Sequence, residues 1–119
     1  MIRPLLLAGL AAVLHASEHI ERLHVRAYCP CILCCGINAK GILSTGGTCK
    51  RHPAGIAVDP ARFPYGTRFA VPGYGTLPAD DTGGDLRAGV GDIEVRFPDH
   101  KTALAWGVKT LDVIVITKD

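Results

Sequence analysis

Three carboxylates near a glycine turn have the types and spacing that suit acid–base chemistry. Asp81 comes directly before a Thr-Gly-Gly turn at residues 82–84, and Asp92 and Glu94 follow two residues apart on an expected strand. The two therefore project from the same face, and glycines let a ligand approach the backbone closely. Like charges at close range retain one proton near neutral pH, and a general acid needs such a proton. Alternatively, Asp92, Glu94 and Arg96 form a solvated strand face with an ordinary ion pair.

A second group with chemical potential is a set of five cysteines within one short stretch. They are Cys29, Cys31, Cys34, Cys35 and Cys49. Export would favour disulfides, and the odd number then leaves one thiol over. A structural zinc site is a second interpretation, and free or redox-active thiols are a third. The zinc ligands would be Cys31, Cys34, Cys49 and His52. No nucleophile motif surrounds the cysteines, so a catalytic cysteine is not expected.

Composition places the chain among ordinary globular proteins and excludes several classes. Its 119 residues are 48% hydrophobic and 20% charged, which predicts one domain with a real core. The net charge of +2 is too balanced for a polybasic nucleic-acid binder. No apolar run is long enough to cross a bilayer. We expect a monomer that binds no nucleic acid and does not insert stably into a membrane.

The first residues resemble an export signal. Residues 1–16 contain one early Arg, an apolar stretch and small residues near Ala16, as a signal peptide does. This interpretation predicts an exported protein, either periplasmic or extracellular. The alternative is an amphipathic helix that continues through His24.

Beyond residue 50 the sequence predicts short strands separated by tight turns. The expected strands cover residues 55–58, 68–71, 77–81, 93–97 and 112–117. One short helix is expected over Lys101–Lys109, where the apolar residues follow a helical spacing. Six or seven short strands with so little helix indicate a mainly β fold, a small β-barrel.

Six short motifs then follow one another along residues 25–117. They are Tyr28-Cys29-Pro30-Cys31 with Cys34-Cys35-Gly36, Ala57-Val58-Asp59-Pro60, Pro64-Tyr65-Gly66-Thr67, Val71-Pro72-Gly73-Tyr74-Gly75, Asp81-Thr82-Gly83-Gly84 and Ala103-Leu104-Ala105-Trp106-Gly107. In this order the motifs resemble the 3D domain, which is named for three aspartates. That domain is related to membrane-bound lytic transglycosylase A and to the rare lipoprotein A group. The resemblance implies a six-stranded double-psi β-barrel that acts on bacterial peptidoglycan, with no cofactor.

The family's three aspartates carry over to this sequence with one departure. The first corresponds to Asp59 and the second to Asp81. The family's spacing puts the third, which resembles the catalytic acid of the transglycosylase, at Asp92, whereas the Ile-Asp-Val-x-Phe motif puts it at Glu94. We favour Glu94, because insertion in a glycine-rich loop costs little, whereas a shift of strand phase turns every side chain over.

The resemblance implies a lytic transglycosylase-like reaction on peptidoglycan glycan strands. Glu94, or else Asp92, would protonate the glycosidic oxygen and then take the proton of the C6 hydroxyl, which closes a 1,6-anhydro ring. Asp81 would hold the acid in place.

Other positions would serve the substrate or the fold. Gly83 and Gly84 would let the sugar chain lie close, and Arg87 would contact a substrate carboxylate. Asp59 would be a structural corner.

Two further functions compete with cleavage. In the transglycosylase a second domain forms the opposite wall of the glycan groove, and this sequence is not expected to supply it. A non-catalytic module that binds or loosens the wall is therefore the main alternative, with Tyr65, Tyr74 or Trp106 as stacking surfaces, although Trp106 belongs to the apolar side of the expected helix. The third hypothesis is a zinc-stabilised interaction protein of the cytoplasm.

Overall fold

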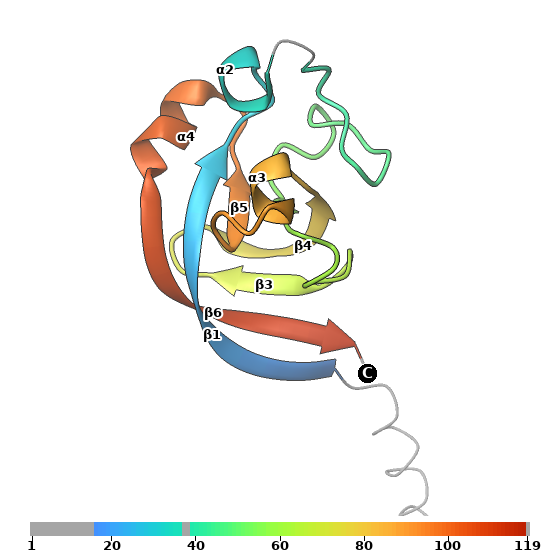
Figure 1. Cartoon of the computed structure of the whole chain (residues 1–119), viewed down its shortest axis with the longest axis vertical. Helices are drawn as coiled ribbons and strands as arrows, with labels where there is room; N and C mark the ends of the chain where they lie inside the picture. The colour runs from blue at the N-terminus through green and yellow to red at the C-terminus, as the bar shows by residue number, and fades with distance from the viewer. Residues whose placement is uncertain (1–15, 37–38, 119) are drawn as a thin grey trace, which may run out of the picture.

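The computed structural model describes residues 16–36 and 39–118, and these form a closed barrel of six strands (Figure 1). In chain order the elements are β1 (Ala16–Tyr28), α2 (Ile32–Cys35), β2 (Ile56–Ala57), β3 (Arg68–Val71), β4 (Gly75–Asp81), α3 (Gly84–Arg87), β5 (Ile93–Arg96), α4 (His100–Trp106) and β6 (Val108–Lys118). The strand order around the barrel is β1-β5-β2-β4-β3-β6, and β6 closes the barrel against β1. The mainly β, six-stranded barrel expected from the sequence is confirmed.

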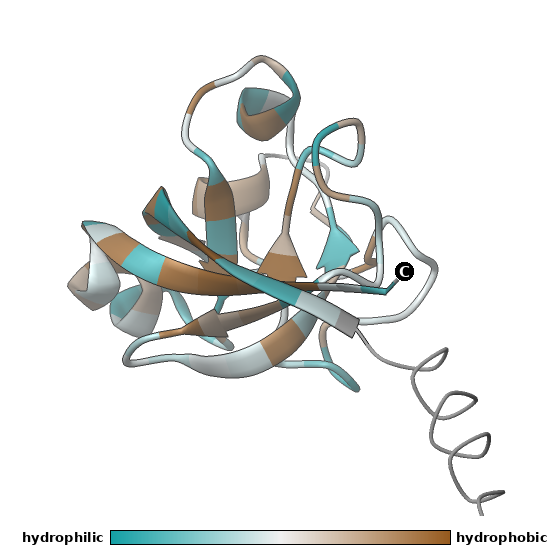
Figure 2. Cartoon of the chain, turned by 90° about the horizontal axis from the view of Figure 1, so that it is seen from below, coloured by the Kyte–Doolittle hydropathy of each residue, from teal (hydrophilic) through white to brown (hydrophobic). Residues whose placement is uncertain are grey.

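The longest feature of the barrel is the antiparallel pair of β1 and β6. Their register runs from Ala16 opposite Lys118 to Arg26 opposite Val108. Seen from below, the two strands carry both hydrophobic and hydrophilic stretches (Figure 2). The side chains that turn into the barrel lie at every second position, and they are Leu23, Val25, Val113 and Val115. Residues up to His24 thus lie in a strand, whereas the alternative drawn from the sequence gave them to a helix. Of the expected signal peptide, residues 1–15 lie outside the described part of the chain.

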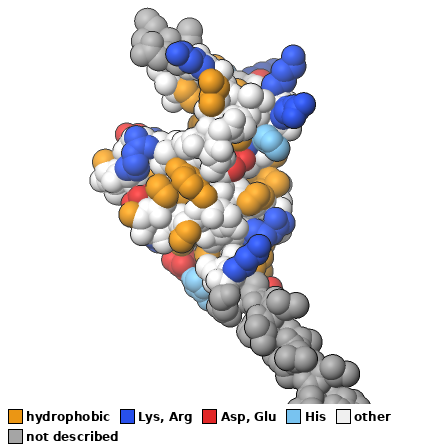
Figure 3. All heavy atoms as spheres, turned by 90° about the vertical axis from the view of Figure 1, so that its right-hand side faces the viewer, with side chains coloured by type: hydrophobic (Ala, Val, Ile, Leu, Met, Phe, Trp, Pro, Cys, Tyr) orange, Lys and Arg blue, Asp and Glu red, His pale blue; other side chains and the backbone are white. Residues whose placement is uncertain are grey.

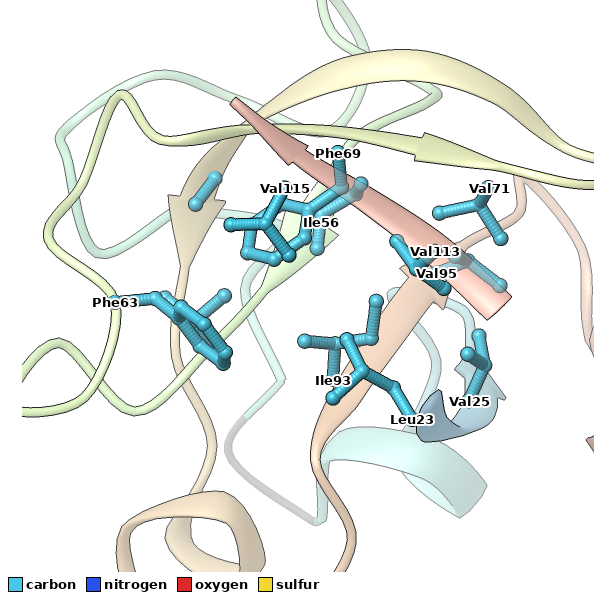
Figure 4. Close-up of a cluster of buried hydrophobic side chains, with 12 residues drawn as sticks. Leu23, Val25, Ile56, Phe63, Phe69, Val71, Ile93, Val95, Val113 and Val115 are labelled. Carbon is cyan, nitrogen blue, oxygen red and sulfur yellow. The ribbon is translucent and has the colours of Figure 1, made fainter. Parts of the chain in front are cut away.

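The barrel interior is filled by β-branched and aromatic side chains (Figure 4). Ile93 and Val95 of β5 are fully buried, as the alternation in the sequence predicted. Phe63 and Phe69 pack edge to face, with ring centroids 5.1 Å apart. Burial of each such side chain stabilises the fold by about 1.5–3 kcal/mol, so this core holds the six strands in register.

The helices are short and differ in part from the sequence prediction. The predicted helix over Lys101–Lys109 corresponds to α4, which ends at Trp106 because Gly107 adopts a φ of 69°. Val108 and Lys109 therefore begin β6 instead. Two additional helical turns, α2 and α3, lie in stretches rich in cysteine and glycine. Among the described residues, none of the helices has the length and apolar character of a membrane span.

Candidate functional site

A pocket of about 430 Å³ opens where β4 ends. Its walls come from residues 39–44, from Cys49 and from the turn at residues 82–87, and the buried residues Tyr28 and Asp81 also face it. We call it the Asp81 pocket. It brings together four of the residues selected from the sequence, which are Asp81, Gly83, Gly84 and Arg87.

Hydrogen-bond donors surround the carboxylate of Asp81 inside this pocket. Oδ1 accepts from the backbone N of Ser44 at 3.0 Å, from the Ser44 hydroxyl at 2.8 Å and from the backbone N of Thr82 at 2.9 Å. Oδ2 accepts from the Tyr28 hydroxyl at 2.7 Å. Four donors thus hold both carboxylate oxygens in place. Asp81 therefore fixes the loop that carries Ser44, and it makes no direct contact with Glu94, the acid that the sequence expectation had it hold.

Behind Asp81 lies a buried arginine that sequence reasoning assigned to a solvated face. All five N–H donors of Arg96 are used. Two go to the Asp80 carboxylate, one to the Tyr28 hydroxyl, and one each to the carbonyl oxygens of His52 and Ala54. Burial alone would lower the pKa of Arg96, but the hydrogen bonds that Arg96 donates to Asp80 and its interaction with Tyr28 outweigh burial and raise that pKa. Burial together with the charge of Asp81 raises the pKa of Tyr28.

Gly83 and Gly84 form the part of the pocket wall where a ligand would meet bare backbone. A Cβ added at either position would meet no protein atom closer than 4.0 Å, and neither residue has a positive φ. The fold itself therefore does not require glycine here. Arg87, at the end of α3, is exposed and donates from Nη1 to the Thr82 hydroxyl at 3.2 Å.

Glu94 lies on β5 but does not line the Asp81 pocket. Its backbone pairs with Arg26 of β1 and with Ala57 of β2. Within residues 16–36 and 39–118 its carboxylate takes part in no hydrogen bond or ion pair. Burial raises the pKa of Glu94, and the charges of Asp85 and Asp81 add to this effect, against the opposing charge of Arg26. Glu94 is thus a half-buried carboxyl group that holds its proton more firmly than an ordinary glutamate.

Asp92 lies just before β5 and has the opposite character. It accepts from the backbone N of His24 at 2.7 Å and from Nη1 of Arg62 at 2.6 Å. Burial alone would raise the pKa of Asp92, but these hydrogen bonds outweigh it and lower that pKa. Asp92 faces a separate hollow with Gly91 and Val108. The three carboxylates expected to act together are therefore not gathered in one pocket.

Asp59 stands at a chain corner after β2. Its Oδ1 accepts from the backbone N of Ala61 at 3.0 Å, and its carbonyl oxygen accepts from the backbone N of Arg62 and of Phe63. This turn sets the direction of the chain after β2.

The cysteines group differently from the zinc set expected from the sequence. Cys29, Cys31, Cys34 and His100 form one cluster, with ligand atoms that all lie within 4.8 Å of one another. We call this the cysteine–histidine cluster. All five cysteines are free thiols in the structure.

Cys49 and His52, the other two expected ligands, are not in this cluster. The backbone N of Cys49 donates to the carbonyl of Gly41, and the carbonyl of His52 accepts from Arg96. His100 was missed because it lies about seventy residues from the cysteines in sequence and belongs to no local motif.

Of the aromatic residues considered as stacking surfaces, two pack among other rings. Tyr74 lies edge to face with Phe97 and with Trp106, at centroid distances of 5.3 Å and 6.1 Å. The indole N–H of Trp106 donates to the carbonyl of Val25 at 3.2 Å. Tyr65 is exposed.

Comparison with known proteins agrees with the motifs and the barrel. The model of the 3D domain matches residues 54–117 of this chain. The cell wall-binding protein YocH of Bacillus subtilis (strain 168) is 40% identical over 78 residues, which cover 64% of this chain and 26% of YocH. YabE of the same organism, whose provisional name is that of a cell wall shaping protein, is 37% identical over 78 residues, which cover 64% of this chain and 19% of YabE. The chain thus spans about a quarter or less of the length of these relatives.

Proposed function

This chain belongs to the 3D domain family, and from that membership we propose that it is an exported protein that acts on bacterial peptidoglycan. The names of YocH and YabE both refer to the cell wall, one to binding it and one to shaping it. The aligned segment is a minor part of each relative, so the proposal concerns this barrel and its ligand.

The surface around the Asp81 pocket suits an anionic glycan. Lys40 and Arg87 face the pocket, and Lys50 and Arg51 are exposed on the same loop region. Figure 3 views the molecule from the side of that loop and shows Lys and Arg side chains around the border of the face, with smaller Asp and Glu patches between them. Peptidoglycan carries lactyl and peptide carboxylates, which guanidinium and ammonium groups bind by charge-assisted hydrogen bonds.

We infer that the reaction is cleavage of the glycan with Glu94 as the general acid. The observation that carries this inference is the half-buried Glu94 carboxyl group, which has no hydrogen-bond partner among the described residues and a raised pKa. Protonated Glu94 gives its proton to the glycosidic oxygen, and the bond between this oxygen and C1 of muramic acid breaks. The resulting carboxylate takes the proton of the C6 hydroxyl, whose oxygen bonds to C1. The products are a free glucosamine hydroxyl and a 1,6-anhydro ring, and Glu94 is again protonated.

A non-catalytic wall-binding function is the second candidate, and a specific observation favours it. Glu94 lies outside the Asp81 pocket, and the Asp81 carboxylate is already bound by four donors. In that case the pocket holds the glycan without breaking it. The name of YocH says of that relative that it binds the cell wall.

The deciding experiment is mass spectrometry of the soluble fragments that the purified chain releases from insoluble peptidoglycan. Cleavage predicts fragments that end in 1,6-anhydro-muramic acid. Glu94→Gln should reduce their release by at least about 100-fold, since general acid catalysis contributes 10²–10⁴. Asp92→Asn tests the rival acid and should retain release, and Asp112→Asn is an exposed control on β6.

Each other outcome has a defined meaning. Fragments with reducing ends would replace the anhydro mechanism by hydrolysis. Release that survives Glu94→Gln but not Asp92→Asn would move the acid to Asp92. No fragments, together with co-sedimentation of the chain with peptidoglycan, would establish the binding function instead.

A further inference from the structure

The cysteine–histidine cluster lies at the end of the barrel where α2 and α4 meet (Figure 1). Cys29 directly follows β1, Cys31 directly precedes α2 and Cys34 lies within it, and His100 is the first residue of α4. Cys29 is buried, and the other three are half-buried. Two segments far apart in sequence thus bring four side chains with metal-binding atoms to one point.

The distances within the cluster fit a tetrahedral ion. Nδ1 of His100 lies 3.7 Å, 3.5 Å and 3.4 Å from the sulfurs of Cys29, Cys31 and Cys34. With Zn–S near 2.3 Å and Zn–N near 2.0–2.1 Å, a tetrahedron has S···N edges of about 3.6 Å. The sulfur of Cys29 lies 2.9 Å from that of Cys31 and 3.2 Å from that of Cys34. Those two edges need to open by less than about 1 Å to reach the tetrahedral value.

These sulfur–sulfur distances also separate the cluster from a disulfide. Both exceed the S–S bond length of about 2.03–2.05 Å by far. The single sulfur of Cys29 also lies near two other sulfurs, those of Cys31 and Cys34. A disulfide would leave the imidazole at the centre of the cluster without a role. Three thiols and one imidazole are instead a complete ligand set for zinc.

We propose that Cys29, Cys31, Cys34 and His100 bind one structural Zn²⁺. The three thiols lose their protons to solvent, the imidazole binds through Nδ1, and four protein ligands leave no open position for catalysis. The site ties the end of β1 to the start of α4. Pro30, between Cys29 and Cys31, and Cys35, directly after Cys34, line the Asp81 pocket, so the ion also fixes one wall of that pocket.

The local backbone supports this arrangement. The backbone N of Cys34 and that of Cys35 donate to the carbonyl of Cys31, at 3.2 Å and 2.8 Å. The resulting tight turn directs the thiols of Cys31 and Cys34 toward one point. At the other segment, Asp99 caps α4 by accepting from the backbone N of Thr102 at 2.8 Å. This cap fixes where α4 begins and therefore where His100 lies.

The remaining two cysteines provide matched controls. The Cys35 thiol is directed to the carbonyl of Cys29 at 3.2 Å, away from the cluster. Cys49 is buried in the wall of the Asp81 pocket. Neither belongs to the ligand set, although Cys35 is adjacent to one ligand in sequence.

The test is the zinc content of the full chain, produced with zinc and purified without chelators, measured by elemental mass spectrometry. We expect about one zinc per chain. Cys31→Ser and His100→Ala should lower the content at least tenfold, and Cys35→Ser and Cys49→Ser should leave it unchanged. His100→Cys should restore binding, because it replaces one ligand by another. Cobalt in place of zinc should give the visible absorption of a tetrahedral thiolate site, which Cys31→Ser abolishes.

Contrary outcomes are equally defined. Zinc below a tenth of one equivalent in the wild-type chain, or a disulfide between two of the three cluster cysteines in the intact mass, would overturn the proposal. Full zinc content in His100→Ala, or its loss in Cys49→Ser with the fold intact by circular dichroism, would show that the ligand set is wrong. The measurement does not depend on peptidoglycan, so it is independent of the proposed function.

Discussion

Arg96 and Asp80 form a two-pronged ion pair, with Nη1 2.9 Å from Oδ1 and Nη2 2.8 Å from Oδ2. The guanidinium is wholly buried, while the Asp80 side chain is 20% exposed. Removal of one partner leaves a buried charge without compensation, which costs about 3–5 kcal/mol. Asp80→Asn should lower the free energy of unfolding by about that amount, as measured by urea denaturation.

The exposed pair of Arg22 and Asp112 is the control for this prediction. Nη1 of Arg22 lies 3.0 Å from Oδ1 of Asp112, but the two side chains are 65% and 63% exposed. Asp112→Asn should therefore cost less than about 1 kcal/mol. Equal effects of the two substitutions would contradict a buried pair at Arg96.

Gly55 explains why the pair can pack so closely against β2. A Cβ at this position would lie 2.2 Å from Nη2 of Arg96 and 2.7 Å from Oδ2 of Asp80. Gly55→Ala should therefore destabilise the fold by at least about 1–3 kcal/mol, because the surroundings are fixed by hydrogen bonds. Thermal unfolding measures this, and a neutral Gly55→Ala would show that the network rearranges freely.

Gly84→Ala makes the complementary prediction. Space at Gly84 is open, so the substitution should change stability by no more than about 0.5 kcal/mol. If the proposed function is right, the added methyl group occupies the pocket wall, and co-sedimentation with peptidoglycan should weaken. Unchanged binding would place the glycan away from the Asp81 pocket.

Part of the barrel was predictable because β5 alternates between apolar and charged residues in sequence. Ile93 and Val95 were placed correctly from sequence, since a core face repeats every second residue. Alternation alone could not predict that Arg96 is buried, because an outward-facing position on a barrel is solvated only if no other segment covers it. Here residues 52–55 and Tyr28 cover that face, and their arrival depends on long-range pairing.

The candidate site was predictable only where its residues are close in sequence. The turn at 82–84 follows Asp81 directly, so that part of the pocket was identified. Glu94 and Asp92 are equally acidic in sequence, and only the structure separates them, because Arg62 and His24 bind one and not the other. His100 lies close to the three cysteines because β1 and β5 pair in parallel and end at the same end of the barrel, which no local spacing encodes.

Asp81→Asn should loosen the loop at Ser44. The amide keeps one acceptor oxygen, whereas four donors now share two carboxylate oxygens. Unsatisfied donors cost about 1–3 kcal/mol, and the exposed loop should open before the barrel does. Hydrogen exchange should therefore accelerate at Ser44 while the core strands remain protected. Uniform acceleration across the barrel would mean that Asp81 supports the whole fold.

Glu94→Gln should stabilise the protein at neutral pH. Burial raises the folded-state pKa of Glu94, so the folded state binds its proton more tightly than the unfolded state does. The wild-type chain therefore loses stability as pH rises from the unfolded-state pKa through the raised folded-state pKa, and the glutamine variant does not. The difference in melting temperature should be small below about pH 4, where glutamate is protonated in both states, and should grow to a plateau at higher pH.

Asp92→Asn provides a control of opposite sign for the same measurement. Hydrogen bonds from His24 and Arg62 lower the folded-state pKa of Asp92 against the effect of burial, so its ionised form stabilises the fold. That stabilisation is present above the unfolded-state pKa and is lost as pH falls through the folded-state pKa. Asp92→Asn should therefore be less stable than the wild-type chain at neutral pH, and the gap should close in acid. If both variants shifted stability in the same direction at neutral pH, the two carboxyl groups would not have the opposite environments on which the assignment of the acid to Glu94 rests.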